Sequence, residues 1–328
     1  MGIYRFILAI LVLINHTGLN TFNFATGPFA VINFLIISGY LNTYLIENHY
    51  SYNKKISSYY LDRFLRIAPQ FYFYFFLAIF LNFYFKVIEF NFLNVLLEFP
   101  IITQGYYFLF DNIFGTNIYN TLKINPPVWS LGLELTFYIV IPFVIIYFKN
   151  YIKYFFLFSL ILFLIVFIFS YRNDALGFRL LPGTFFTFLI GSYLYYSKKG
   201  IRKIVLFTLV IFIILFIITY SNINSIYYKT IYNKEIISAI ILGTLTLNYI
   251  KKKKSNKIDI FFGNLCYGIF LNHFFIIRIF EKYFTLSYNN IILVIFLSII
   301  LSYISFTFIE NNASKIRKKI RYRNLNDK

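Results

Sequence analysis

The sequence predicts an all-α, polytopic membrane protein with about ten transmembrane helices. The 328 residues are 59% hydrophobic and only 13% charged, whereas a soluble domain carries about 25% charged residues. The mean hydropathy is +0.69. Apolar runs of about 18 or more residues recur from one end of the chain to the other, and that is the length a helix needs to cross a bilayer. We therefore expect one membrane domain and no appended soluble domain.

The apolar segments are taken in chain order. The first begins at Ile3 and carries Arg5 near its start. No small-residue cleavage site follows at residues 18–24, so we interpret it as a retained span and not as a signal peptide. The longest stretch between spans, residues 87–129, contains an apolar part at residues 93–110 that we expect to be re-entrant or interfacial. The expected spans are roughly residues 3–19, 28–46, 69–86, 134–148, 154–171, 180–197, 204–220, 233–250, 260–280 and 289–309.

The distribution of charge predicts the orientation of these spans. Formal net charge is +19. If the N-terminus is cytoplasmic, the cytoplasmic segments hold most of the 31 Lys and Arg residues, including those after Glu310. The positive-inside rule then places both termini in the cytoplasm. We divide the chain into a membrane domain at 1–310 and a basic cytoplasmic surface tail at 311–328. Topology and contact with anionic membrane lipids explain the basic excess, so no nucleic-acid partner is expected.

Arg5 and His16 are the basic residues of the first span, eleven positions apart. On a helix, eleven residues return to nearly the same face and rise about 16 Å. Ionisable side chains inside a membrane are costly and often mark a functional site. A neutral imidazole suits a general base, because its ordinary pKa of about 6.5 lies near physiological pH. The alternative is a structural histidine that bonds a neighbouring helix.

Two further segments carry charged residues at helical spacing. Arg63 and Arg66 share one helix face just before the third span, where two guanidinium groups are able to hold phosphate oxygens. The alternative is a basic flank that meets lipid headgroups. Glu134 follows Trp129 and Ser130 at the start of the fourth span. Our topology puts Glu134 at the level of His16, so a His–Glu pair is allowed; the alternative is a carboxylate favoured by the helix dipole.

Other polar residues give weaker predictions. His273, in the ninth span, either lines the same cavity or packs structurally, and Arg179 either meets an anionic substrate or is solvated. No nucleotide-binding loop, dinucleotide fingerprint, zinc-ligand cluster or serine nucleophile elbow is present, so no metal is expected. The single cysteine, Cys266, excludes an internal disulfide framework.

Together these segments resemble the acyltransferase-3 family of bacterial integral membrane acyltransferases, over nearly the whole chain. Two departures from the family pattern are Cys266, where serine is usual, and Asn312, which replaces a common proline after Glu310. The resemblance rests on five motifs in the family's order: Arg5 with His16, Asn33 to Leu41, Arg63 to Pro69, Val128 to Tyr138, and Phe262 to His273.

The resemblance implies an O-acyltransferase of the bacterial inner membrane. An enzyme of this kind would transfer an acyl group, most often acetyl from acetyl-CoA, to a hydroxyl of a surface saccharide such as O-antigen or capsule, or of a lipid-linked precursor. Acetyl-CoA is then the acyl donor, and no metal is involved. With this function we expect donor binding by Arg5, Arg63 and Arg66, catalysis by His16 as base or acyl carrier with Glu134 orienting it, and acceptor binding by Trp129, Ser130, His273 and Arg179.

Two other functions remain open. A transporter or flippase for lipid-linked saccharides would use the buried His and Glu as a proton or substrate path. A polysaccharide polymerase is the other alternative, with the long outer loop in its favour. Binding of CoA distinguishes the enzyme from both.

Overall fold

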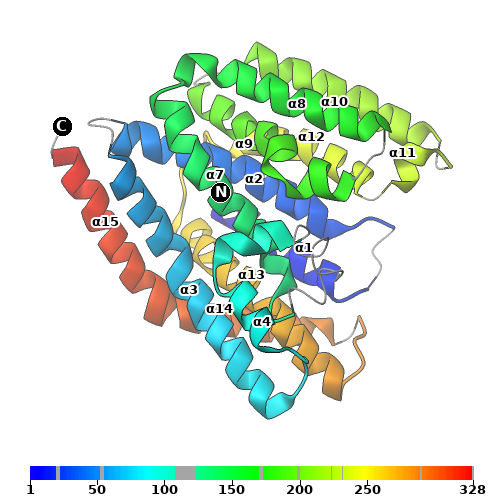
Figure 1. The fold of residues 1–328 in the computed structure, drawn as a ribbon, viewed down its shortest axis with the longest axis vertical. Coiled ribbons are helices and arrows are strands. Elements are labelled where there is room, and N and C mark those ends of the chain that lie inside the picture. The colour runs from blue at the N-terminus through cyan, green and yellow to red at the C-terminus, as the bar shows by residue number, and fades with distance from the viewer. Residues whose placement is uncertain are drawn as a thin grey trace. The chain divides into compact units, whose positions relative to one another are not determined.

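A computed structural model of the chain describes residues 1–19, 23–51, 55–107, 123–169, 173–197, 200–222, 224–230, 232–288 and 290–326. All regular elements within these ranges are helices (Figure 1). The chain divides into two compact units. The first contains residues 20–56 and 136–254 with Met1, and the second contains residues 2–19, 57–135 and 255–328.

Within the described ranges, eight helices are long and apolar enough to cross a membrane by length and composition. They confirm the predicted class of all-α polytopic membrane protein. Two further helices, α1 (Gly2–His16) and α12 (Asn233–Ile250), coincide with the first and eighth expected spans but are not among the eight. The orientation of the termini stays a prediction.

The first unit is built around closely packed α2 and α9. A Cβ atom added to Gly39 of α2 would lie 1.8 Å from the Phe188 carbonyl oxygen, and one added to Gly191 of α9 would lie 2.0 Å from that of Ile36. Only glycine permits this backbone approach. The helices of this unit are α2 (Thr26–Leu45) with a π-helical turn (Ile46–Tyr50), the second half of α7 (Trp129–Ile146), a 3₁₀ turn (Lys149–Tyr151), α8 (Ile152–Phe169), a π-helical turn (Asn173–Arg179), α9 (Leu181–Tyr196), α10 (Lys203–Ser221), α11 (Ile226–Lys229) and α12.

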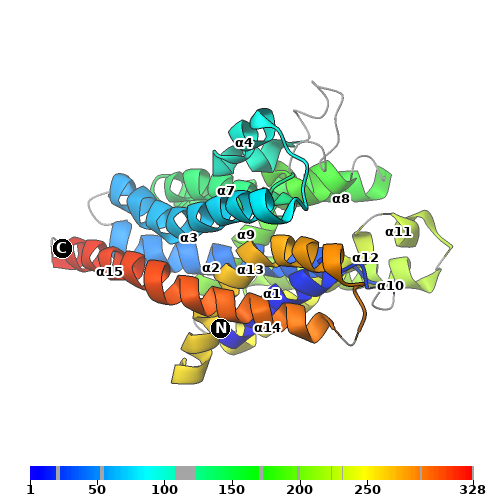
Figure 2. The same ribbon diagram turned by 90° about the horizontal axis from the view of Figure 1, so that it is seen from below.

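The second unit contains the remaining helices. They are α1, α3 (Ile56–Phe85), α4 (Phe92–Glu98), 3₁₀ turns (Ile101–Tyr106 and Pro126–Val128), the first turns of α7, α13 (Lys257–Tyr283), α14 (Ile291–Ser305) with a π-helical turn (Phe306–Glu310), and α15 (Asn311–Asn326). Figure 2 shows α15, in red, continuing the chain from α14.

Buried polar side chains join α3, α13 and α14. The Tyr74 hydroxyl of α3 donates to Ser305 Oγ at 2.6 Å, and the Asn272 side chain of α13 donates to the Ser298 carbonyl at 3.0 Å. The Gln70 amide of α3 reaches the same Ser305 hydroxyl at 3.0 Å. Hydrogen bonds between buried polar groups fix the relative register of helices whose remaining contacts are apolar.

The third span is longer than expected, and the C-terminal tail forms a helix. We expected the span to begin at Pro69, but α3 runs from Ile56 through Pro69. Its 30 residues give a length of about 45 Å, longer than a bilayer core of about 30 Å. The expected surface tail forms the helix α15, and its Arg317 side chain is only 11% exposed because it packs on α3.

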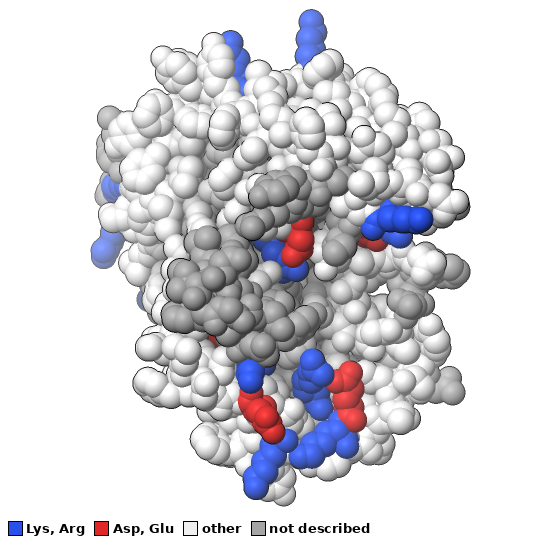
Figure 3. All heavy atoms as spheres, turned by 45° about the vertical axis from the view of Figure 1, so that its right-hand side comes forward, with Lys and Arg blue, Asp and Glu red and all other residues white. Residues whose placement is uncertain are grey.

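Much of the outward surface is apolar. On α3, Phe76, Phe80 and Phe83 are 55%, 68% and 76% exposed. On the face drawn in Figure 3, most of the described surface is uncharged, and the charged side chains gather in a few groups. Such a surface is unfavourable in water and is what lipid contact requires.

Candidate active site

Helices α1 and α13 pack side by side and run parallel. Near their N-terminal ends, the Ile3 backbone N–H donates to Asp259 Oδ1 at 3.0 Å, across 256 positions of sequence. At the C-terminal end of α1, the ring centroids of His16 and His273 lie 5.3 Å apart, across 257 positions (273 − 16). The sequence separation between contacting residues is nearly the same at both ends, 256 and 257 positions, so the two helices run parallel along their shared length. This packing brings together two histidines to which the sequence analysis gave different roles.

Glycines allow the N-terminal ends of the two helices to approach. A Cβ atom added to Gly263 would lie 2.8 Å from the Gly2 Cα atom and 2.9 Å from Arg5 Nη2. Arg5 therefore packs against α13 at Gly263, and its Nε is buried without a hydrogen-bond partner in the described part of the chain. The structure confirms that Arg5 and His16 share one helix, α1, so they are about 16 Å apart along its axis.

His273 is fully buried, and its two ring nitrogens differ. Nδ1 lies 3.1 Å from the Ile269 carbonyl oxygen. Because a carbonyl only accepts, Nδ1 must carry the hydrogen of this bond. In the neutral ring Nε2 then holds the lone pair, and it is buried with no partner among the described residues. The edge of Phe274 packs on the His16 ring, with centroids 6.2 Å apart. The two imidazoles thus form a polar pair on an apolar wall, with one nitrogen able to accept a proton or a hydrogen bond.

A buried carboxylate fixes the loop before α7. Glu98, at the end of α4, accepts hydrogen bonds from the backbone N–H groups of Lys123, Ile124 and Asn125 at 2.7, 2.8 and 3.0 Å. Burial raises the pKa of Glu98 to about 7, and these three hydrogen bonds oppose the rise. The Asn125 side chain donates to the Leu271 carbonyl at 2.8 Å. The loop is therefore attached to α13 two residues before His273.

The start of α7 carries three of the predicted site residues. Trp129 and Ser130 are buried in its first turn, and Glu134 is half-buried one turn later. A Cβ atom on Gly132 would lie 2.2 Å from the backbone nitrogen of Gly105, so the 3₁₀ turn before residue 107 packs directly on this turn. Pairing of Glu134 with His16 stays a prediction.

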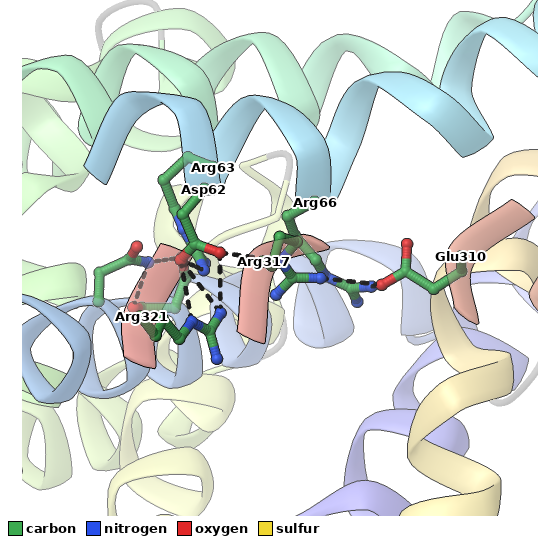
Figure 4. Close-up of polar contacts among 8 residues, drawn as sticks. Asp62, Arg63, Arg66, Glu310, Arg317 and Arg321 are labelled. Carbon is green, nitrogen blue, oxygen red and sulfur yellow. Dashed lines mark hydrogen bonds and ion pairs between the residues drawn. The ribbon is translucent and has the colours of Figure 1, made fainter. Parts of the chain in front are cut away.

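Asp62 is the centre of an arginine cluster (Figure 4). It is fully buried and accepts hydrogen bonds from three arginines. Arg63 Nη2 lies 2.7 Å from Oδ2 and Arg317 Nε lies 3.0 Å from Oδ1. Arg321 contacts both carboxylate oxygens through Nη2 at 3.1 Å. A helix from the end of the chain is thereby joined to the predicted donor-binding arginines.

Glu310 extends this cluster to Arg66. Its Oε1 accepts from Arg66 Nη1 and from Arg317 Nη1, the latter at 3.0 Å. We call Asp62, Arg63, Arg66, Glu310, Arg317 and Arg321 the arginine cluster. It holds four guanidinium groups and two carboxylates, which gives a net charge of +2 (4 − 2).

The arginine cluster and the histidine pair lie along the same helix. The Arg66 guanidinium is 5.0 Å from the centroid of the Tyr267 ring on α13, and the Tyr267 hydroxyl donates to the Ile67 carbonyl at 2.9 Å. Tyr267 precedes His273 by six residues, or about 9 Å of helix rise. Arg5 meets α13 one turn earlier still, at Gly263. The cationic side chains of Arg5 and Arg66 therefore lie beside the first half of α13, and the two imidazoles lie further along this helix.

Arg179 belongs to the first unit. Its Nε lies 2.8 Å from Asp174 Oδ1, and the residue is 9% exposed. Its assignment as an acceptor-binding residue stays a prediction. Within the described ranges, no group of three His, Cys, Asp or Glu side chains is placed to hold a metal ion.

Sequence reasoning assigned no role to several residues of these sites: Asp62, Glu98, Tyr267, Glu310, Arg317 and Arg321. One signal was available. Residues 310, 317 and 321 are spaced by seven and four, so they share a helical face, and a charged stripe of this kind needs a partner. No comparable spacing marks Glu98, whose partners are backbone groups.

The comparisons agree with the architecture. Residues 3–309 match the sequence profile of the family described as "Acyltransferase domain", and the chain belongs to this acyltransferase-3 family. It is also similar to an uncharacterized protein of Aquifex aeolicus (strain VF5), at 36% identity over 203 residues, which is 58% of this chain and 89% of that protein. No solved structure matches. The protein is thus a multi-pass helical membrane protein and an acyltransferase.

Proposed function

We propose that the protein transfers an acyl group, acetyl in the simplest case, from acyl-CoA to a hydroxyl of a surface saccharide. The observation that carries the proposal is the arrangement along α13. Arg66, a member of the arginine cluster, lies over Tyr267, and two imidazoles meet at His273 about 9 Å further along the helix axis.

The arginine cluster suits the donor. CoA carries several phosphate charges, and guanidinium groups bind phosphate oxygens through paired hydrogen bonds. Of the two cluster arginines on α3, Arg66 is the more accessible, with a side chain that is 21% exposed against 7% for Arg63. From there the extended pantetheine arm would follow α13 toward His16, bringing the thioester to the histidine pair.

The histidine pair suits the chemistry. His16 takes the proton of the acceptor hydroxyl as its oxygen attacks the thioester carbonyl carbon. The C–O bond forms, the C–S bond breaks, and the departing thiolate takes up the proton from the imidazolium to leave CoA thiol. General base catalysis of this kind contributes about 10²–10⁴-fold to the rate. A route in which His16 first carries the acyl group gives the same products. Glu134 stabilises the imidazolium, and the Nε2 atom of His273 accepts a hydrogen bond from His16 or from the hydroxyl.

The acceptor binds on the other side of the histidine pair, where the loop held by Glu98 leads into Trp129 and Ser130. In this proposal the protein lies in the bacterial inner membrane with its arginine cluster at the cytoplasmic face. The acceptor hydroxyl belongs to O-antigen, capsule or a lipid-linked precursor. The acyl group then crosses the membrane on the protein while CoA stays inside.

The test is O-acetylation of the host's surface polysaccharide in cells that express wild-type protein, His16→Ala or His49→Ala at matched membrane levels. His49 is a suitable control because it lies in the first unit, in the turn after α2. We expect acetate on the polysaccharide with the wild type and with His49→Ala and none with His16→Ala.

Equal acetylation with His16→Ala would contradict the catalytic assignment. Absence of any acylation, together with polysaccharide that no longer reaches the surface when the gene is deleted, would favour a transporter instead.

A further inference from the structure

We propose that the C-terminal helix α15 is part of the donor-binding site. Arg317 and Arg321 complete, with Arg63 and Arg66, a site for a soluble ligand that carries at least two negative charges on phosphate groups. The identification of this ligand as acyl-CoA rests on the function proposed above.

Arg317 and Arg321 are one helical turn apart on α15, and both reach Asp62 on α3 (Figure 4). Asp62 already accepts from Arg63 of its own helix. A simple tether between two helices needs one arginine and one carboxylate, whereas here three guanidinium groups converge on a single carboxylate.

The arginine cluster has a surplus of two positive charges, and its members are largely removed from solvent. The side chains of Arg63 and Arg317 are only 7% and 11% exposed. Charges in such surroundings are stable only when they are balanced and hydrogen-bonded. A ligand with two phosphate charges would bring the net charge to zero.

A guanidinium has five N–H donors, and a carboxylate accepts about four hydrogen bonds. Asp62 receives five hydrogen bonds from the three arginines, so it is saturated. Arg321 directs only Nε and Nη2 at Asp62, and its Nη1 has no hydrogen-bond partner in the described part of the chain. With 24% of its side chain exposed, Arg321 is able to turn this edge toward a phosphate.

Phosphate groups come either from a soluble nucleotide or from a lipid headgroup. The position of the cluster favours the soluble ligand. Arg66 lies over Tyr267 of α13, the helix that also carries His273. A ligand whose phosphate groups bind at Arg66 would therefore extend the rest of its length along α13.

The experiment is equilibrium binding of radiolabelled CoA to the purified full-length protein in neutral detergent at low salt. It compares the wild type with Arg321→Ala, Arg321→Lys and Arg323→Ala. Arg323 is the matched control, because it is an exposed arginine in the last turn of the same helix. We expect Arg321→Ala to weaken CoA binding about tenfold or more, as loss of a charge-assisted pair does. Arg323→Ala should leave the affinity unchanged within about twofold.

The outcomes separate this inference from the proposed function. Binding of CoA with equal affinity by the wild type and Arg321→Ala would overturn the role of α15 and leave the acyltransferase proposal standing. If CoA does not bind but inorganic pyrophosphate binds in an Arg321-dependent way, the anion site holds and the CoA donor is wrong. Binding of short-chain phosphatidylglycerol in place of both soluble anions would overturn the inference.

A second measurement does not depend on whether a variant folds. Hydrogen exchange of the wild-type backbone is followed with and without CoA. The inference predicts slower exchange across residues 311–326 when CoA is bound, because the ligand would fix α15 on α3. Unchanged exchange in α15, with CoA shown to be bound, would overturn it.

Discussion

Replacement of Asp62 by asparagine removes the one carboxylate on which three arginines converge. The side chain keeps its size and one acceptor oxygen, so packing is nearly preserved. The net charge of the arginine cluster rises from +2 to +3, since one of the two carboxylates is lost. Breaking a buried ion pair from one side costs about 3–5 kcal/mol, because the remaining charge is left without its partner. We expect a fall in stability of that order and partial detachment of α15.

The assay is the midpoint of thermal unfolding in detergent, with Glu281→Gln as the control. The Glu281 side chain is 36% exposed and pairs with Arg278, which is 43% exposed, and an exposed pair contributes only about 0–1 kcal/mol. Asp62→Asn should lower the midpoint far more than Glu281→Gln, and inorganic pyrophosphate should restore part of the loss. Equal midpoints for the two variants would show that the cluster does not depend on its central carboxylate, and the reasoning would fail.

The remaining predictions concern the loop and the glycine contact that support the histidine pair. The folded-state pKa of Glu98, about 7, lies above its unfolded value of 4.5, so the folded protein binds more protons between these pH values. Stability should therefore fall as pH rises from about 4.5 to 7, and Glu98→Gln should lose this dependence while the exposed control Glu89→Gln keeps it. A pH profile of the unfolding midpoint that is the same for wild type and Glu98→Gln would contradict the assignment. Separately, Gly263→Ala should force α1 away from α13 and abolish acyl transfer, because its Cβ atom would lie 2.8 Å from the Gly2 Cα atom. Gly177→Ala, whose nearest neighbour would be at 3.5 Å, should remain active in the same assay, and equal activity of the two variants would refute the packing argument.

Local patterns in the sequence were sufficient for the helical class and for part of the site. The eleven-residue spacing of Arg5 and His16 places both on one helix, because the period of an α-helix is fixed. The spacing of Arg63 and Arg66 works in the same way. Pro69 misled the prediction of the third span, since a proline at a helix start and one inside a continuous helix look alike in a single sequence.

Contacts between distant segments could not be predicted in this way. The hydrogen bonds between Asp62 and Arg321 join residues 259 positions apart. The meeting of His16 with His273 depends on parallel packing of α1 and α13, which hydropathy does not encode. Glu98 binds backbone N–H groups, so nothing in the side chains of its partners signals the contact. In each case the information lies in tertiary packing.

The central claim is that His16 performs chemistry on a donor bound at the arginine cluster. The most direct measurement is release of free thiol from acetyl-CoA by purified protein supplied with host saccharide, made alongside CoA binding to the same samples. The account predicts that His16→Ala binds CoA as tightly as the wild type and releases no thiol. It also predicts that Arg321→Ala reaches wild-type thiol release only at a higher acetyl-CoA concentration. Thiol release by His16→Ala at the wild-type rate would contradict the account.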